Sequence, residues 1–180
     1  MDFLLYGYFG AGNLGDDLLL SVATAELRAI FPTARFFVGD HGHAVPEIHD
    51  CVFTKTETIL ADQTKPRIVR LALYLAAYSR LFRQCAWFVF AGGTVFHERG
   101  TTNVLLLQWL LCLLARLHGV KIAALGVGIA DLHSYSGRWL MRRIVGMSRL
   151  FLVRDEAALA QCSGTKAGLG DDLVFAWAGT

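Results

Sequence analysis

The feature that most constrains the fold is an alternation between short apolar runs and longer segments whose apolar residues recur at helical spacing. The short runs predict strands at 3–9, 35–39, 51–54, 86–90, 121–125 and 150–153. The longer segments predict helices at 18–31, 66–83, 102–119, 137–147 and 156–162. Strands that alternate with helices build a parallel sheet, so we expect an α/β fold with a doubly wound, mainly parallel, Rossmann-like sheet.

Length and composition limit the class of protein. A chain of 180 residues with no visible linker or repeat predicts a single domain, residues 1–180. Its 54% hydrophobic content excludes a disordered chain. The formal charge is only +2, and no long basic stripe stands out. We therefore expect no nucleic-acid partner, because such binding depends on neutralising phosphates.

Two apolar stretches, 68–90 and 104–117, are tested as membrane spans. Arg70, Arg80 and Arg83 interrupt the first, and the second is shorter than the roughly 20 residues that a span needs. Both are predicted to be buried helices. The N-terminus carries no basic region or cleavage site typical of a secretory signal, so we expect a cytoplasmic protein.

Single, widely spaced cysteines indicate reduced core residues, because no pair has metal-ligand or redox spacing. These residues are Cys51, Cys85, Cys112 and Cys162.

Four of the predicted strand ends carry residues suited to ligand binding. Ligands of open parallel sheets bind outside the carboxyl ends of the strands. Glycines follow three of these ends, in segments 10–15, 91–94 and 126–128, and the pair Arg154 and Asp155 follows a fourth. The convergence predicts one crevice that binds an anionic ligand.

The first glycine segment also matches a dinucleotide fingerprint, with Asp40 where a ribose-binding acid is expected. A nicotinamide or flavin enzyme is therefore one alternative. Against it, Asp16 and Asp17 place two carboxylates in the first turn of the helix, where a pyrophosphate would bind. A second alternative is a tight turn with no ligand, since glycine is common in such turns.

Taken as an ordered set, segments 7–17, 88–96, 125–129 and 152–156 resemble the polysaccharide pyruvyl transferase family. The resemblance implies transfer of a pyruvyl group from phosphoenolpyruvate to a sugar of a cell-surface polysaccharide or its precursor. It implies no cofactor beyond phosphoenolpyruvate as donor substrate. It also implies a two-domain fold like that of the GT-B glycosyltransferases, of which this chain resembles the amino-terminal half, with the second domain absent.

The chain departs from the family pattern at a few positions. Ala91 replaces the first glycine of a triplet, Ala130 stands where the family often has glycine, and Ala158 stands where a serine is common. The segment 172–175 lacks the proline that the family carries there.

The glycine-rich strand ends and the resemblance together define the predicted substrate-binding residues. They are Gly10, Gly12, Asn13, Gly15, Asp16, Gly92, Gly93, Thr94, Gly126, Gly128, Arg154 and Asp155. Bare backbone amides of the glycines could bind an anionic or sugar group, or the glycines could only allow close packing.

Charged side chains near these ends each have two interpretations. Arg154 could hold the phosphate or carboxylate of phosphoenolpyruvate, or form an ion pair with Asp155 or Glu156. Asp155 could cap the following helix. The catalytic residues are unknown, with Asp16 and His97 as candidates. His97 and Glu98 could act as a proton donor and its partner, or lie in a solvated loop.

Three histidines and a set of arginines each have a simple structural explanation beside a functional one. His41, His43 and His49 lack a further ligand at a recognised spacing, so no metal is expected. The arginines of segment 138–143 could touch an anionic membrane surface, or form the solvated edge of a helix that packs on the sheet.

The leading hypothesis is a polysaccharide pyruvyl transferase or its amino-terminal domain, acting on a sugar acceptor, free or lipid-linked. The alternatives are a non-catalytic sugar- or nucleotide-binding module and an NAD-type domain. Expected partners are the acceptor, a membrane surface, and either a second copy or a missing carboxy-terminal domain. We expect the 180-residue chain alone to show no pyruvyl transfer, and to self-associate or bind membranes, because two-domain enzymes assemble their sites from both halves.

Overall fold

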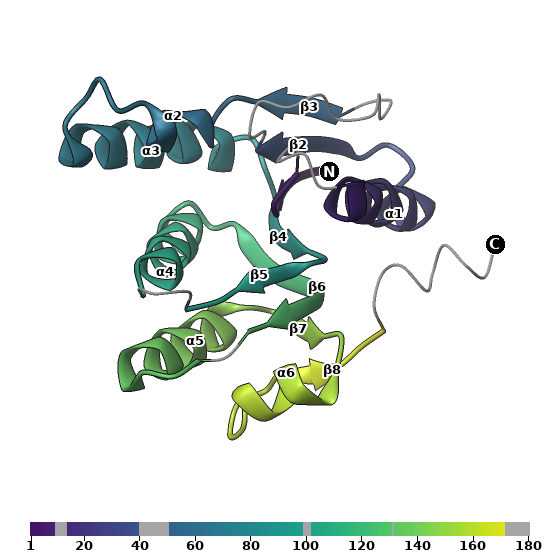
Figure 1. The fold of residues 1–180 in the computed structure, drawn as a ribbon. Helices are drawn as coiled ribbons and strands as arrows, with labels where there is room; N and C mark the ends of the chain where they lie inside the picture. Colours follow the sequence, from purple (N-terminus) through teal and green to yellow (C-terminus); the bar gives the residue numbers. More distant parts are fainter. Residues whose placement is uncertain (10–13, 40–50, 99–101, 131, 172–180) are drawn as a thin grey trace.

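The computed structural model describes all residues except 10–13, 40–50, 99–101, 131 and 172–180 (Figure 1). Its strands are β1 (Asp2–Tyr6), β2 (Arg35–Gly39), β3 (Cys51–Thr54), β4 (Trp87–Ala91), β5 (Thr94–Phe96), β6 (Lys121–Ile129), β7 (Leu150–Val153) and β8 (Gly168–Leu169). Its helices are α1 (Leu14–Ile30), α2 (Thr58–Ala61), α3 (Arg67–Phe82), α4 (Asn103–Leu117), α5 (Tyr135–Met147) and α6 (Glu156–Gln161).

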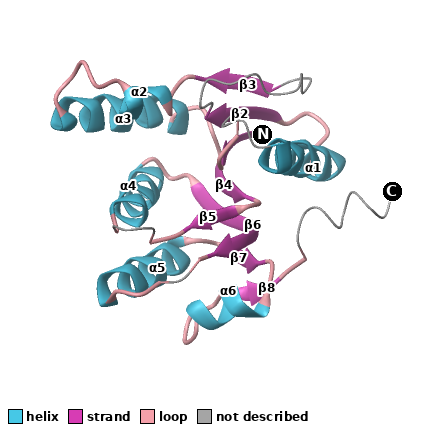
Figure 2. Ribbon diagram, viewed as in Figure 1, coloured by secondary structure: helices cyan, strands magenta, loops and turns pink. Residues whose placement is uncertain are grey.

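The main sheet has the strand order β3-β2-β1-β4-β6-β7-β8, and every recorded pair is parallel. Helices cover both faces, as Figure 2 shows. This arrangement confirms the predicted doubly wound, Rossmann-like α/β fold. The sequence pattern did not predict α2, β5 or β8, which are short.

Alternating side chains of the central strands fill two separate cores. On one face, Phe3 and Leu5 of β1 pack with Leu20 and Leu27 of α1. On the other face, Leu4 belongs to a larger core with residues of α3, α4 and α5. Successive strand residues point to opposite faces, so a single apolar run supplies both cores.

Helix α4 turns its few less apolar residues toward the core. Its few less apolar residues, Gln108, Cys112 and Ala115, are fully buried. Gln108 donates from Nε2 to the Val95 carbonyl at 3.0 Å. The apolar flanks of α4 contact α3 and α5 on either side, so neighbouring helices cover much of them.

The cysteines are free, and all except Cys51 are buried. Burial raises the pKa of the Cys85 thiol to about 12 and that of the Cys162 thiol to about 11. This agrees with the prediction of reduced core residues. Among the described residues, no helix is long and apolar enough to cross a membrane.

Candidate functional site

A glycine corner lies where the main ladder of β4 and β6 ends. The ladder pairs Ala91 with Leu125, and β6 then continues through both of its glycines to Ile129. Gly92, Gly93 and Gly126 adopt positive φ values of 60°, 61° and 58°, a region that favours glycine. We call Gly92, Gly93, Gly126 and Gly128 the glycine corner.

At this corner the chain changes direction and pairs again. After Gly93 it continues as β5, which runs in a different direction from β4 in Figure 1 and pairs with the end of β6. The Gly128 amide donates to the Gly93 carbonyl at 2.7 Å. The predicted glycine segments therefore do follow the main ladder. The expectation that the strand ends at residue 125 was wrong, because a second short ladder continues it.

Asp16 approaches the glycine corner from the first turn of α1. A Cβ atom added to Gly93 would lie 2.5 Å from Asp16 Oδ1, so only glycine leaves room for this carboxylate. Helix α1 begins at Leu14, four residues earlier than predicted, and Gly15 and Asp16 thus belong to its first turn. An acidic side chain here is favoured by the positive end of the helix dipole.

Arg154 approaches the same corner from the end of β7. Its guanidinium donates from Nη2 to Thr94 Oγ1 at 3.2 Å and from Nε to Asp155 Oδ2 at 3.3 Å. A Cβ atom on Gly128 would lie 2.9 Å from Arg154 Nε, so the guanidinium lies directly over that glycine. Its side chain is 32% exposed, which leaves it within reach of a ligand.

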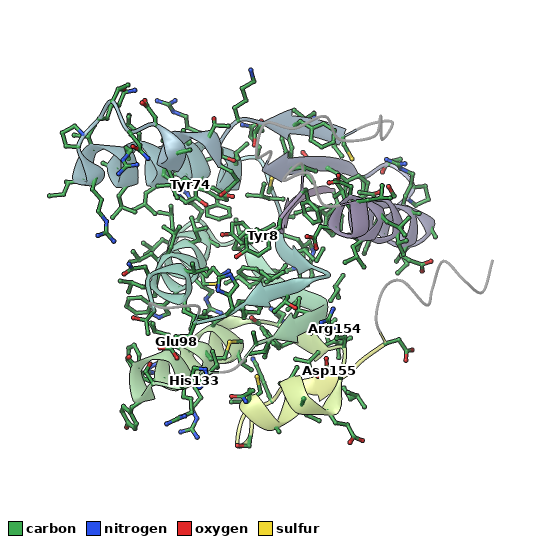
Figure 3. All side chains as sticks on the ribbon, viewed as in Figure 1. Tyr8, Tyr74, Glu98, His133, Arg154 and Asp155 are labelled. Atoms are coloured by element: carbon green, nitrogen blue, oxygen red, sulfur yellow. The ribbon has the colours of Figure 1, made fainter. Side chains whose placement is uncertain are left out.

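Asp155 fulfils both of its predicted structural roles. Its Oδ1 accepts from the Ala158 amide at 2.7 Å, which caps α6, and its Oδ2 pairs with Arg154 (Figure 3). The carboxylate thus holds the guanidinium and starts the next helix. The ion pair predicted as an alternative for Arg154 is present, and it coexists with the contact to Thr94.

His97 and Glu98 do not form a pair. His97 Nε2 lies 2.6 Å from the hydroxyl of Tyr8, whose ring stacks on the imidazole. Glu98 instead accepts from the amide of Ser134 at 2.9 Å and from its hydroxyl, at the start of α5 (Figure 3). Burial raises the pKa of Glu98, but these hydrogen bonds outweigh it and lower the pKa overall. Glu98 therefore orients the α5 cap.

Sequence reasoning missed two groups at the carboxyl edge. One is Tyr8, which lies two residues after β1 and within segment 7–17, but for which no role was predicted. The other is a cluster in which the half-buried Glu57 accepts from two buried tyrosines, from Tyr74 at 2.9 Å and from Tyr78 at 2.6 Å. Burial, and then the carboxylate of Glu57, raises the pKa of the Tyr78 hydroxyl well above its ordinary value. Two tyrosines four positions apart on a helix were the available signal.

Several predicted positions lie outside the described residues. These are Gly10, Gly12, Asn13, Asp40, His41, His43 and His49. Among the residues that the structure describes, no group of three or more His, Cys, Asp or Glu side chains could hold a metal ion.

The parallel sheet defines a Rossmann-like α/β protein. Its carboxyl edge carries a candidate anion site, formed by the glycine corner and by the arginine at the end of β7. The family model for polysaccharide pyruvyl transferase matches residues 13–178. The chain therefore belongs to the polysaccharide pyruvyl transferase family. A comparison with curated proteins finds no match.

Proposed function

We propose that the chain binds phosphoenolpyruvate at the glycine corner and takes part in pyruvyl transfer to a sugar. The observation that carries this proposal is the position of Arg154 over Gly128, held by Thr94 and Asp155. A guanidinium binds phosphate or carboxylate through a planar fork of donors, and phosphoenolpyruvate carries both groups.

The proposed reaction needs proton transfer at two points. One sugar hydroxyl oxygen bonds to C2 of the enol and gives up its proton, while C3 takes a proton and becomes a methyl group. The oxygen of a second hydroxyl of the same sugar then bonds to C2 as the C2–O bond to phosphate breaks, and its proton passes to the departing phosphate, leaving a cyclic ketal and inorganic phosphate. Asp16, which reaches Gly93, is the side chain that we propose as the base. His97 with Tyr8 is the second candidate for proton transfer.

The site also bears on the dinucleotide alternative. In a dinucleotide-binding fold, the pyrophosphate takes the positive end of the first helix. Here Asp16 lies in that first turn and its carboxylate reaches Gly93. The carboxylate of Asp16 would repel a pyrophosphate at this position. This favours binding of phosphoenolpyruvate by Arg154 over binding of NAD at the first turn of α1. The free cysteines support a reducing, cytoplasmic location for the proposed reaction.

Calorimetric titration tests the proposal. We expect phosphoenolpyruvate to bind wild type, and Arg154→Ala to weaken that binding by roughly 10- to 100-fold, the range for a lost hydrogen bond to a charged group. Arg149→Ala, at an exposed arginine just before β7, is the matched control and should bind like wild type. Equal affinity in Arg154→Ala would remove Arg154 from the site. NAD binding tighter than that of phosphoenolpyruvate would favour the dinucleotide alternative.

A further inference from the structure

The charges of this chain are strongly segregated, although they nearly balance overall. Residues 63–153 contain twelve of the 17 Lys and Arg residues but only two of the 15 Asp and Glu residues. Within this stretch, α3, α4 and α5 together contain seven arginines and no acidic residue. The small net charge of the whole chain conceals this basic layer of helices.

The three helices lie side by side on one face of the sheet (Figure 1). Helix α3 is apolar on both sides. Tyr74 and Tyr78 face the core, whereas Ile68, Val69 and Leu73 are 82%, 43% and 44% exposed. The prediction that this segment is a buried helix was therefore wrong for its outer side. No described element covers these side chains, and exposed aliphatic groups in a cluster are typical of a binding surface.

A groove of about 290 Å³ lies between α3 and α4, next to this outer side. Leucines of both helices line it, together with Arg67 and Arg70. Arg70 donates from Nη1 to the Leu60 carbonyl at 2.6 Å. Its Nε is buried and has no hydrogen-bond partner among the described residues. Arg67 is exposed at the same groove, so a cation borders its apolar lining.

We propose that α3, α4 and α5 form a docking surface for an anionic lipid bilayer. The outer apolar side of α3 would enter the boundary between headgroups and acyl chains. The flanking arginines would lie at the level of the lipid phosphates, with Arg67 at the edge of the groove. This combination of exposed aliphatic residues and cations is characteristic of helices that lie in the membrane interface. The proposal does not depend on pyruvyl transfer.

Other occupants fit these observations less well. A symmetric dimer through this layer would place the same patch on both subunits, and thus set arginines against arginines with no acidic residue to pair them. A nucleic acid would neutralise the arginines but would leave Ile68 and Leu73 against a charged backbone. Helix α5, for which the sequence left a membrane contact open beside a solvated basic edge, would take part through Arg142, Arg143 and the 41% exposed Trp139.

Vesicle co-sedimentation of the full chain tests the proposal. We expect binding to vesicles of phosphatidylcholine and phosphatidylglycerol in equal parts, and little binding to phosphatidylcholine alone. Each arginine strengthens such binding about fivefold, so Arg67→Glu combined with Arg80→Glu should weaken it at least about 25-fold. Leu73→Glu should also weaken it, and its exposed position preserves the fold.

Matched controls lie outside the helix layer. Lys166→Glu reverses a charge elsewhere, and Ile30→Glu places a charge at a 68% exposed position on α1. Both should bind vesicles like wild type. Three outcomes would overturn the proposal. The first is equal binding to both kinds of vesicle. The second is binding of single-stranded RNA that Leu73→Glu leaves unchanged, while no vesicles are bound. The third is a dimer in sedimentation velocity that Leu73→Glu dissociates.

Discussion

Two polar groups lie at the carboxyl edge of this sheet, and they are built in opposite ways. Beside β2 and β3, Glu57 accepts from the hydroxyls of two fully buried tyrosines, Tyr74 and Tyr78. Beside β5 and β7, Arg154 holds Thr94 but stays 32% exposed. In the first group the two hydroxyls are sealed in the core, while Glu57 itself is half-buried, and the hydrogen bonds support the fold. The second keeps a cation at the surface, where a ligand can reach it.

The two groups differ because different side chains lie against the backbone at the two strand ends. At the end of β2, a Cβ on Gly39 would lie 3.2 Å from Glu57 Oε1, so side chains pack tightly around the backbone. At the glycine corner, the positive-φ residues turn the chain, and the side chains of Asp16 and Arg154 lie against the backbone of Gly93 and Gly128. The glycines of the corner thus let two charged side chains, Asp16 and Arg154, approach the backbone at this edge of the sheet.

The largest loss of stability should come from removing the carboxylate of Glu57. Glu57→Ala removes the acceptor of two buried hydroxyls, and each unpaired hydroxyl costs about 1–3 kcal/mol. We expect the free energy of unfolding to fall by about 2–4 kcal/mol in urea denaturation. Glu57→Gln keeps an acceptor oxygen and should lose less. If Glu57→Ala leaves the urea midpoint unchanged, this group does not support the fold.

The next effect tests the strain at the corner. Gly93→Ala places a Cβ 2.5 Å from Asp16 Oδ1 at a residue whose φ is +61°. We expect a loss of about 1–3 kcal/mol in unfolding free energy, the cost of a side chain in an unfavourable backbone region. The comparison variant is Gly146→Ala, where a new Cβ meets no atom within 4 Å. Equal stability of the two variants would show that the corner is not constrained.

A smaller effect, on ligand affinity and not on stability, is expected from a substitution beside Arg154. Gly128→Ala would place a Cβ 2.9 Å from Arg154 Nε, and the flexible arginine can move away. We expect phosphoenolpyruvate affinity to fall about tenfold, the equivalent of one weakened hydrogen bond. The thermal midpoint should stay near that of wild type, unlike that of Gly93→Ala. A large drop in midpoint with unchanged affinity would assign Gly128 to the fold and not to the site.

The smallest effect concerns Glu98, which serves the fold at the start of α5. Glu98→Ala removes the acceptor that holds Ser134 at the α5 cap, at a cost of about 1 kcal/mol. Because the pKa of Glu98 is lowered in the folded state, its contribution is present above the unfolded pKa and disappears as pH falls through the folded pKa. Wild type and Glu98→Ala should therefore converge in urea stability at acidic pH. A constant difference down to pH 3 would contradict this.

The sequence alone was sufficient for features that depend on neighbouring residues. Alternating apolar patterns predicted the main strands and helices, and β7 has the bounds that the sequence predicts. The cap of α6 by Asp155 was also predictable, because its donor lies only three residues away. Glycine positions marked the corner, since only glycine adopts such φ values readily.

Tertiary structure decided which side chains meet. Arg154 bonds Thr94, which lies 60 positions away in the chain, and Tyr8 meets His97 across 89 positions. Nothing in the local pattern separates His97 from Glu98, yet the first turns to β1 and the second to α5. The same holds for α4, whose Gln108 turns to the core, where the Val95 carbonyl accepts a hydrogen bond from its side-chain amide. Local spacing fixes which face a residue shares with its neighbours in an element, whereas the packing of elements far apart in the chain fixes what that face meets.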